Sequence, residues 1–373
     1  MSQIKQMLDE IKGILNGIGK NDSICIIHHD DADGCTSAAL FSILIKNLIG
    51  DYPLLFPIRG EENISRGMLN QMKIINPDYV FVLDVSIDAR KLNLFKGFIL
   101  DHHIFNDFPS NPTFKYFNPR VFEKDDEKIL PVSYMTYKLL KEMFPQERVA
   151  WIAAIGITED HRVELCRDVF EDVRRENPDL LGDQEITQIK IENSIFGQFW
   201  DMVRSGRMIR KTEGARTAVL ALIETKDRPD KFFNGLTQHS FALRNFYDKV
   251  VYETEDSLID VKEKAKFNYD KKVIIYEARK SNISALTSFI SDKIRQKYPE
   301  WIVCVIGREY GKEHKKLSIR LEQTKRKENL VEILEKVKKD VPTVKGGGHK
   351  SAIGVSVSQE YLDDFLESFL SFI

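Results

Sequence analysis

A buried strand that ends in a run of metal-ligand side chains is the feature that most constrains the fold of this chain. The apolar residues 24–27 are followed directly by His28-His29-Asp30-Asp31-Ala32-Asp33-Gly34. Imidazoles and carboxylates resist burial unless they are paired, protonated or bound to a cation. A divalent metal would relieve the crowding. The sequence therefore predicts a cation site at the end of a buried strand.

Short apolar runs typical of strands alternate with helical patterns in the first third of the chain. The expected strands are 23–27, 53–58, 79–84 and 98–101, and the expected helices are 36–48 and 62–75. This alternation favours a parallel α/β sheet. Three of the strands end in acids or histidines, and open α/β sheets place their active sites at that edge. We therefore expect the metal site at the carboxyl edge of a parallel sheet.

The 373 residues are enough for two α/β lobes, each with its own core. Residues 131–267 are mostly helical, and from 236 onward they fit one long charged helix. A smaller α/β pattern follows, with strands at 273–276, 301–306 and 317–321 and a helix near 283–297. We expect a catalytic lobe with a helical extension over 1–230, a connecting helix over 231–268 and a smaller lobe over 269–373.

Composition excludes several classes of protein. The formal net charge is -2, so no basic field over the whole chain points to duplex DNA binding. The four cysteines form no CxxC pair, which argues against a zinc or redox site and favours reduced, intracellular thiols. The start lacks the features of a secretory signal, and the longest apolar stretch, near 149–157, is too short to span a membrane. We expect a soluble cytoplasmic protein with no membrane segment.

Four segments supply hard metal ligands: HHDDADG at 28–34, LDVS at 83–86, LDHH at 100–103 and IGITEDH at 155–161. Alternate residues of an extended segment face the same way, so His29, Asp31 and Asp33 are expected on one side. Carboxylates and imidazoles without thiolates suit Mn²⁺ or Mg²⁺, and two such ions about 3.5–4 Å apart share a carboxylate. A single Asp at a strand end is usually a helix cap or turn residue. Four such segments together make caps alone a poor explanation.

The order HHDDADGCTSAA, LDVS, LDHH, GITED and, far downstream, GGGHKSAIG resembles the DHH phosphoesterase superfamily, which is named for its Asp-His-His motif. The match follows the motif order over most of the chain. The HxDxDG spacing and the GGGH segment are most similar to RecJ-like nucleases and nanoRNases, whereas family II pyrophosphatases differ at the C-terminus. The resemblance implies an N-terminal DHH domain and a smaller C-terminal substrate-binding domain.

The resemblance also implies two divalent metal ions, with Mn²⁺ preferred and Mg²⁺ as the alternative. The ligands would be His29, Asp31 and Asp84 for one ion, and Asp33, Asp84, His102 and Asp160 for the other. Asp84 would bridge the two ions. Family members differ at the position of His29, and His28 competes with it for this role.

Two further residues of the DHH segment have implied roles in catalysis. His103 would lie next to the scissile phosphate as an acid or hydrogen-bond donor, and Asp101 would orient the histidine pair. His161, just past the fourth segment, fits a supporting role or a contact with substrate equally well.

The second lobe contains a glycine run at 345–350 that would expose backbone N–H groups in a turn. A helix is expected to begin after this turn, at 351–352. Such a turn is a good anion cradle, although most glycine runs are only turns. The resemblance implies substrate contact by Gly347, Gly348 and His349. Arg320, on an expected strand, resembles the arginine with which the family grips a phosphate. On pattern alone, Arg320 is equally a surface residue that pairs with an acid.

The implied function is a metal-dependent phosphodiesterase, first of all an exonuclease that hydrolyses single-stranded DNA or RNA by a two-metal mechanism. One alternative is a nanoRNase that acts on short oligonucleotides, nucleotide bisphosphates or linear dinucleotides. Another is a replication scaffold of the same fold that has lost its metal ligands. Every ligand position is filled here, which argues against a scaffold. A helicase or replisome partner and a homo-oligomer stay open.

Overall fold

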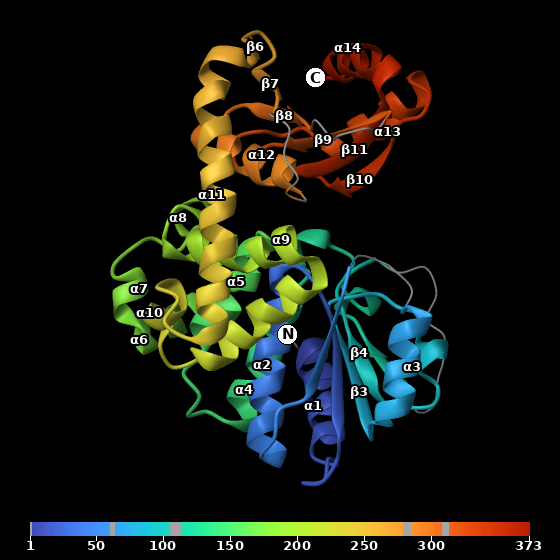
Figure 1. The fold of residues 1–373 in the computed structure, drawn as a ribbon, viewed down its shortest axis with the longest axis vertical. Helices are drawn as coiled ribbons and strands as arrows, with labels where there is room; N and C mark the ends of the chain where they lie inside the picture. Colours follow the sequence, from blue (N-terminus) through green and yellow to red (C-terminus); the bar gives the residue numbers. More distant parts are fainter. Residues whose placement is uncertain (1, 60–63, 105–113, 279–282, 284, 308–312) are drawn as a thin grey trace. The chain divides into compact units, whose positions relative to one another are not determined.

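The computed structural model describes residues 2–59, 64–104, 114–278, 283, 285–307 and 313–373. The chain forms two compact units, 1–247 and 248–373. Helix α11, Gln238–Lys264, runs from the first unit into the second (Figure 1), as predicted for the residues from 236 onward. The domain boundaries expected at 230 and 268 lie on either side of this helix and stay a prediction.

The first unit is built on a five-stranded parallel sheet with the strand order β2-β1-β3-β4-β5. The strands are β1 Ile24–His29, β2 Leu54–Ile58, β3 Tyr79–Leu83, β4 Lys96–Leu100 and β5 Phe114–Phe117. The predicted parallel α/β sheet is confirmed. Strand β5 was not predicted, because its four residues are too few for a clear alternation of apolar and polar side chains.

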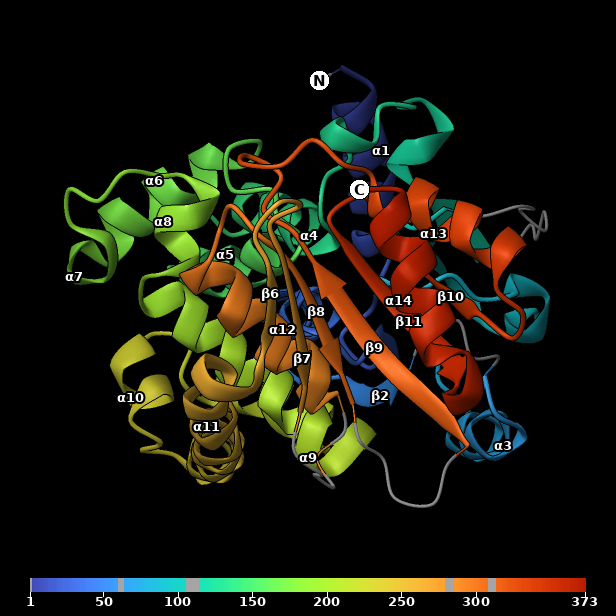
Figure 2. The ribbon, with the colours of Figure 1, turned by 90° about the horizontal axis from the view of Figure 1, so that it is seen from above.

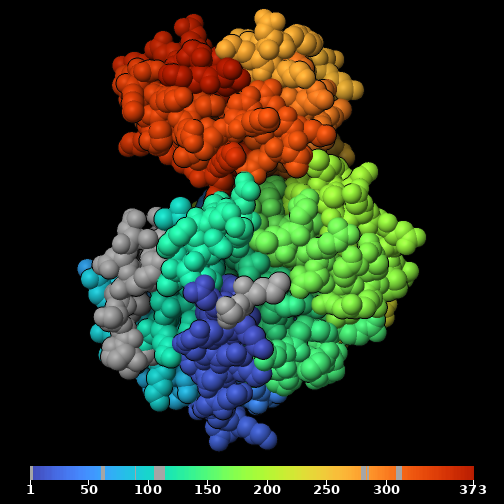
Figure 3. All heavy atoms as spheres, turned by 180° about the vertical axis from the view of Figure 1, so that it is seen from behind, coloured from blue at the N-terminus to red at the C-terminus, as the bar shows by residue number. Residues whose placement is uncertain are grey.

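Strand residues of this sheet alternate between two apolar layers. Ile26, Phe81 and Phe98 belong to a core on one face, and Ile27 and Val82 to a core on the other. The helices of the first core include α1 Ser2–Leu15, α2 Ala32–Ile49, α4 Val132–Met143 and α5 Ala150–Glu159. Helix α3, Arg66–Ile75, joins the second core and lies across the sheet from α2 (Figure 1). Figure 3 shows α1, in dark blue, on the outside of the unit.

A helical extension follows α5 and packs on α2 and α5 through its longest helix, α9. Its helices are α6 Arg167–Glu176, α7 Pro178–Leu181, α8 Gln188–Glu192, α9 Ile195–Glu224 and α10 Pro229–Phe233. Helix α9 is kinked at Lys211, where φ is 53°. Short 3₁₀ turns elsewhere in the chain span Ala89–Leu92, Pro119–Val121, Asp126–Lys128 and Gln359–Tyr361.

Helix α2 is long and apolar enough to cross a membrane by length and composition. The apolar stretch near 149–157 is shorter but less interrupted, because Ser and Thr lie among the apolar residues of α2. In the structure, 78% of this helix is buried inside the first unit. The core helix of a globular domain has this placement.

The second unit contains a six-stranded mixed sheet with the strand order β10-β11-β9-β8-β7-β6. Its strands are β6 Lys266–Asn268, β7 Val273–Glu277, β8 Ile302–Ile306, β9 His314–Arg320, β10 Lys345–His349 and β11 Ala352–Ser358. Its helices are α12 Leu286–Lys297, α13 Leu330–Asp340 and α14 Leu362–Ser371. Figure 2 shows α13 and α14 together beside β10 and β11. The second α/β lobe is therefore confirmed.

The glycine run of the second unit forms a strand, so the predicted turn before a helix is wrong. Residues 345–349 are the edge strand β10, and Ala352 begins strand β11. Gly346 and Gly348 have φ values of 155° and 146°, and a Cβ on either would meet a carbonyl oxygen of β11 at 2.2 Å. Glycine is needed here because the two strands approach so closely.

Candidate metal centre

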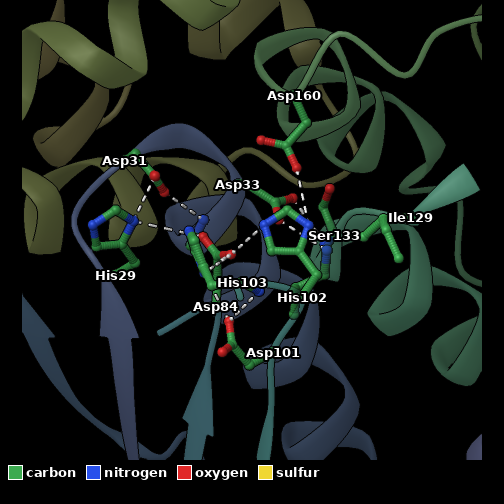
Figure 4. Close-up of polar contacts among 12 residues, drawn as sticks. His29, Asp31, Asp33, Asp84, Asp101, His102, His103, Ile129, Ser133 and Asp160 are labelled. Carbon is green, nitrogen blue, oxygen red and sulfur yellow. Dashed lines mark hydrogen bonds and ion pairs between the residues drawn. The ribbon is translucent and has the colours of Figure 1, made fainter. Parts of the chain in front are cut away.

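The predicted ligands converge at the carboxyl edge of the first sheet (Figure 4). His29 is the last residue of β1, Asp84 follows β3 directly, and Asp101 follows β4. Asp160 is the C-cap of α5 and reaches the same place from the helical layer. Because parallel strands end at one edge, segments that are far apart in sequence bring their polar side chains together.

Among the described residues, candidate ligand atoms form three groups, and within each group they lie within 4.8 Å of one another. The two that hold predicted ligands alone, the ligand groups, are His29, Asp31 and Asp84, and Asp33, His102 and Asp160. The third, Asp84, His102 and His103, shares a residue with each of them. Asp84 lies between the groups: its Oδ2 is 3.7 Å from His29 Nδ1, and its Oδ1 is 3.2 Å from His102 Nε2. The structure thus brings the predicted ligands close to one another, with Asp84 next to both ligand groups, and their binding of metal stays a prediction.

Asp84 has the surroundings of a shared metal ligand. It is 1% exposed, and its φ of 62° is rare for a residue other than glycine. Its N–H donates to Leu100 O at 2.9 Å, which fixes the backbone. Within the described part of the chain, neither carboxylate oxygen has a hydrogen-bond partner. A buried carboxylate in this state is costly, and a cation on each oxygen would remove the cost.

The other carboxylates of the centre also fit a cation. Burial, followed by the charge of Asp84, raises the pKa of Asp33 and of Asp160 well above the usual range. Burial lowers the pKa of His102, but its close contact with Asp84 and the nearby carboxylate charges outweigh this and raise it to about 9. Carboxylate and imidazole ligands together suit Mn²⁺ or Mg²⁺. The residues present therefore fit divalent metal ions.

Asp31 and Asp33 are helix caps as well as candidate ligands. Asp31 is the N-cap of α2, and its Oδ1 accepts a hydrogen bond from Gly34 N at 2.9 Å. Asp33 accepts from Val132 N at 2.8 Å and Ser133 N at 2.9 Å, at the start of α4. The expected extended alternation from residue 29 to Asp33 is wrong in detail, since Asp33 already lies within α2. Two helix starts, rather than a pleated strand, bring the carboxylates together.

Asp101 holds His103 in place. Its Oδ1 is 2.8 Å from His103 Nδ1, and its Oδ2 accepts hydrogen bonds from Ser86 Oγ at 2.5 Å and Tyr116 OH at 2.9 Å. Burial alone would raise the pKa of Asp101, but the hydrogen bond and charge of His103 outweigh it and lower this pKa. The His103 side chain is 39% exposed, against 15% for His102. The geometry is that of an oriented histidine open to solvent.

Sequence reasoning missed two residues that shape the centre from α5. Glu159 Oε2 accepts hydrogen bonds from Ala32 N at 2.5 Å and Asp33 N at 2.9 Å, which anchors the start of α2. A Cβ on Gly156 would meet the hydroxyls of Thr36 and Ser133 and, at 2.8 Å, Asp33 Oδ1, so this position needs glycine. Both residues lie in the IGITEDH segment. Their nearness to Asp160 in the sequence is the signal that could have marked them as part of the centre.

The helical extension also reaches the centre. Arg207 of α9 is 3.5 Å from Asp30 Oδ1 and 3.9 Å from Glu159 Oε1, and sequence reasoning missed it. His161 Nδ1 is 2.9 Å from Glu192 Oε1 of α8, which favours a supporting role. His28 is fully buried, and burial lowers its pKa to about 4. It therefore remains a neighbour of the centre rather than a member.

The predicted substrate residues lie in the second unit. Arg320 donates to Asp292 Oδ1 at 3.1 Å and to Ser288 Oγ at 2.7 Å, and its side chain is 16% exposed. Arg320 therefore pairs with an acid, as its sequence pattern allowed, but this acid lies on α12 and the pair is not at the open surface. Strand pairing aligns Arg320 with Ala352, and Ala352 with His349. Gly347, Gly348 and His349 are exposed.

Residues 270–373 match the family model of the DHHA1 domain, and no curated protein sequence matches the chain. RecJ from Thermus thermophilus, solved in complex with Mn²⁺, has 15% identity and a TM-score of 0.67, and the match covers 99% of this chain and 54% of that RecJ. This chain thus spans about half the length of that protein.

Two other solved structures match over nearly their full length. An exonuclease RecJ bound to manganese has 16% identity and a TM-score of 0.61, with 98% of this chain and 94% of that one covered. CDC45 from Entamoeba histolytica has 11% identity and a TM-score of 0.56, with 98% of each chain covered. At these identities the matches show a shared fold.

Proposed function

We propose that this chain, which has the DHH superfamily fold and carries a DHHA1 domain, is a metal-dependent phosphodiesterase that removes nucleotides from single-stranded DNA or RNA. The environment of Asp84 carries the proposal. This carboxylate is buried, its oxygens have no hydrogen-bond partner among the described residues, and it adjoins both ligand groups. Such a residue is explained by two cations that share it.

Each group of the centre has a role in this proposal. The two ligand groups would hold two divalent ions, and these would supply positive charge that activates water and stabilises the charge on the phosphate. Asp101 fixes His103 through Nδ1, which leaves Nε2 to donate a hydrogen bond to a phosphate oxygen. Glu159 and Gly156 keep the start of α2 and the Asp33 carboxylate in position.

In this proposal the second unit binds the nucleic-acid backbone. Arg320 is held by Asp292 and Ser288, and a guanidinium oriented in this way matches the geometry of a phosphate. Strand β10 is exposed and lies at the edge of its sheet, so it presents backbone groups and no bulky side chains at Gly347 and Gly348. His349 is aligned with Arg320 across β11.

The complete ligand set favours an enzyme over a scaffold of the same fold. A scaffold has no need for buried carboxylates of raised pKa, which cost stability when no cation is present. The mixed carboxylate and imidazole set supports Mn²⁺ or Mg²⁺, and the two RecJ structures were solved with manganese. A cytoplasmic location is part of the proposal, and the four cysteines are free and buried.

The test is a time course with purified protein, Mn²⁺ and single-stranded DNA and RNA of graded length, labelled at one end. We expect products that shorten stepwise, and no products in the presence of a chelator. Asp160→Asn should abolish the reaction, because it removes a candidate ligand of the second group. Asp183→Asn, at an exposed position of the helical extension, is the matched control and should retain full activity.

Two results would contradict the proposal. Full activity in Asp160→Asn would refute the metal assignment. Cleavage of dinucleotides alone, with longer strands left intact, would favour the nanoRNase alternative over an exonuclease.

A further inference from the structure

A cluster of aromatic rings lies at a corner of the second unit, away from the substrate residues named above. It consists of Phe267, Tyr269, Tyr298 and Trp301, which we call the aromatic corner. The ring centroids of Phe267 and Tyr269 are 6.1 Å apart with an interplanar angle of 25°, and those of Tyr269 and Trp301 are 5.5 Å apart at 81°. Phe267 also contacts Tyr298 and Trp301.

Tyr269 is 75% exposed although two ring neighbours hold it. The other three rings are half-buried. A large aromatic residue normally buries most of its surface, and one that is fixed in place but exposed offers a rigid flat surface to a ligand. Such a ring loses little conformational entropy when a partner stacks on it.

The surroundings of the aromatic corner are basic. Hydrogen bonds from Arg326 to Lys271 O and Glu300 O, both at 3.3 Å, join the segments 266–272, 298–301 and 325–328 here. The end of α14 also contacts them, since Lys271 Nζ donates to Leu370 O at 2.6 Å. Together these segments contain six Lys or Arg and three Asp or Glu residues, a local excess of three positive charges. The whole chain has a net charge of -2. The corner is therefore complementary to a polyanion.

We propose that the aromatic corner is a second nucleic-acid site, at which bases of a single strand stack on Tyr269 while the surrounding lysines contact phosphates. Aromatic rings combined with a basic surface bind single strands with little sequence preference, because every base has a flat face. Only the identity of the ligand rests on the proposed function.

Sheet order places this site far from the first set of substrate residues. Strand β6 and strand β10 are at opposite edges of the six-stranded sheet, five strand steps apart. At about 4.8 Å for each step, the separation is roughly 24 Å. A dinucleotide is too short to contact both places. The corner therefore favours strands of several nucleotides over the shortest RNA fragments.

The test is binding of fluorescein-labelled oligo(dT) and oligo(rU) of about 20 nucleotides, a length above the usual site size of single-strand modules. The full chain is used with a chelator, so that no hydrolysis occurs, and affinity is read from fluorescence anisotropy. Tyr269→Ala should weaken binding about 5- to 150-fold, the loss expected for one base stacked on an aromatic ring. Tyr269→Phe keeps the ring and should bind like the wild type.

Tyr252→Ala is the matched control, because Tyr252 is 71% exposed on α11 and lies outside the corner. It should leave the affinity unchanged. The proposal is overturned if the wild type binds neither oligonucleotide, if Tyr269→Ala binds as the wild type does, or if Tyr252→Ala weakens binding equally. A loss of affinity in Tyr269→Ala together with no hydrolysis by the wild type in Mn²⁺ would preserve the corner and refute the phosphodiesterase.

Discussion

Replacing Asp84 with asparagine should uncouple the stability of this protein from divalent metal. The carboxylate is 1% exposed, and among the described residues its oxygens accept no hydrogen bond. Its charge also contributes to the raised pKa values of Asp33 and Asp160. Without metal, Asp84→Asn removes the repulsion of Asp33 and Asp160 but also the attraction of His29 and His102, so the variant should melt near the temperature of the wild type. With metal, the variant lacks the ligand that both ions share.

The size of the effect follows from linkage. A ligand that binds only the folded state stabilises it by about 2.7 kcal/mol at 100 times its dissociation constant. For a domain of the size of unit 1, roughly 1 kcal/mol shifts the melting temperature by about 2–4 °C. One Mn²⁺ ion at this concentration should therefore raise the melting temperature of the wild type by roughly 5–11 °C, and two independent ions by about twice as much. Asp84→Asn should show little of this increase.

The assay is thermal unfolding with chelator and with graded Mn²⁺, followed by hydrolysis of a labelled single strand. Activity should fall by more than about 100-fold, the upper range for residues that only orient metal ligands. Asp88→Asn is the matched control, because Asp88 lies shortly after the LDVS segment in the chain but pairs with Arg90. A full Mn²⁺-dependent increase in the melting temperature of Asp84→Asn would refute the shared-ligand reasoning.

Three further outcomes are expected. Glu159→Ala should weaken Mn²⁺ binding by about 10–100-fold in titration calorimetry, since it removes the oxygen that anchors the start of α2; unchanged affinity would exclude this role. Gly156→Ala should also weaken Mn²⁺ binding, because the added Cβ would press on the Asp33 carboxylate. An affinity equal to that of the wild type would show that the neighbouring side chains move to make room for the Cβ. With chelator, His103→Asn should lower the melting temperature more near about pH 5.5 than near about pH 9. The lowered pKa of Asp101 stabilises the fold at pH values above the pKa of an unfolded Asp. The raised pKa of His103 stabilises the fold at low pH, and this stabilisation is lost as the pH rises through the pKa of the folded state. Equal effects at both pH values would contradict the pairing of His103 with Asp101.

Much of the first unit could be predicted because its signals are local. Strands β1, β3 and β4 are apolar runs that end in polar residues, and parallel strands bring such ends to one edge. That rule is enough to place Asp31, Asp84 and His102 near one another. Their division between two ligand groups came from the family resemblance, because spacing alone does not say which side chains share an ion.

Other features depend on contacts between segments that are far apart in sequence. Glu159 contacts the start of α2 across 127 positions, and no local pattern marks such a pair. The glycines of β10 were predicted to form a turn. Glycine is favoured both in turns and where two strands approach closely, so the sequence alone does not tell these cases apart. Tyr269 belongs to a cluster drawn from two turns, β6 to β7 and α12 to β8, which only the fold brings together.

The hydrogen bonds of Asp31 and Asp33 to helix starts show how the candidate metal centre can be organised before any ion binds. Each carboxylate accepts hydrogen bonds from backbone N–H groups at a helix start, where the helix dipole favours negative charge by about 0.3–1 kcal/mol. These contacts offset part of the repulsion among the carboxylates and fix the direction of the oxygens. Asp84 has no such contact among the described residues, so it gains most from the cation. Metal binding should therefore stabilise an existing arrangement through Asp84, while the loss of either cap should also disturb helix α2 or α4.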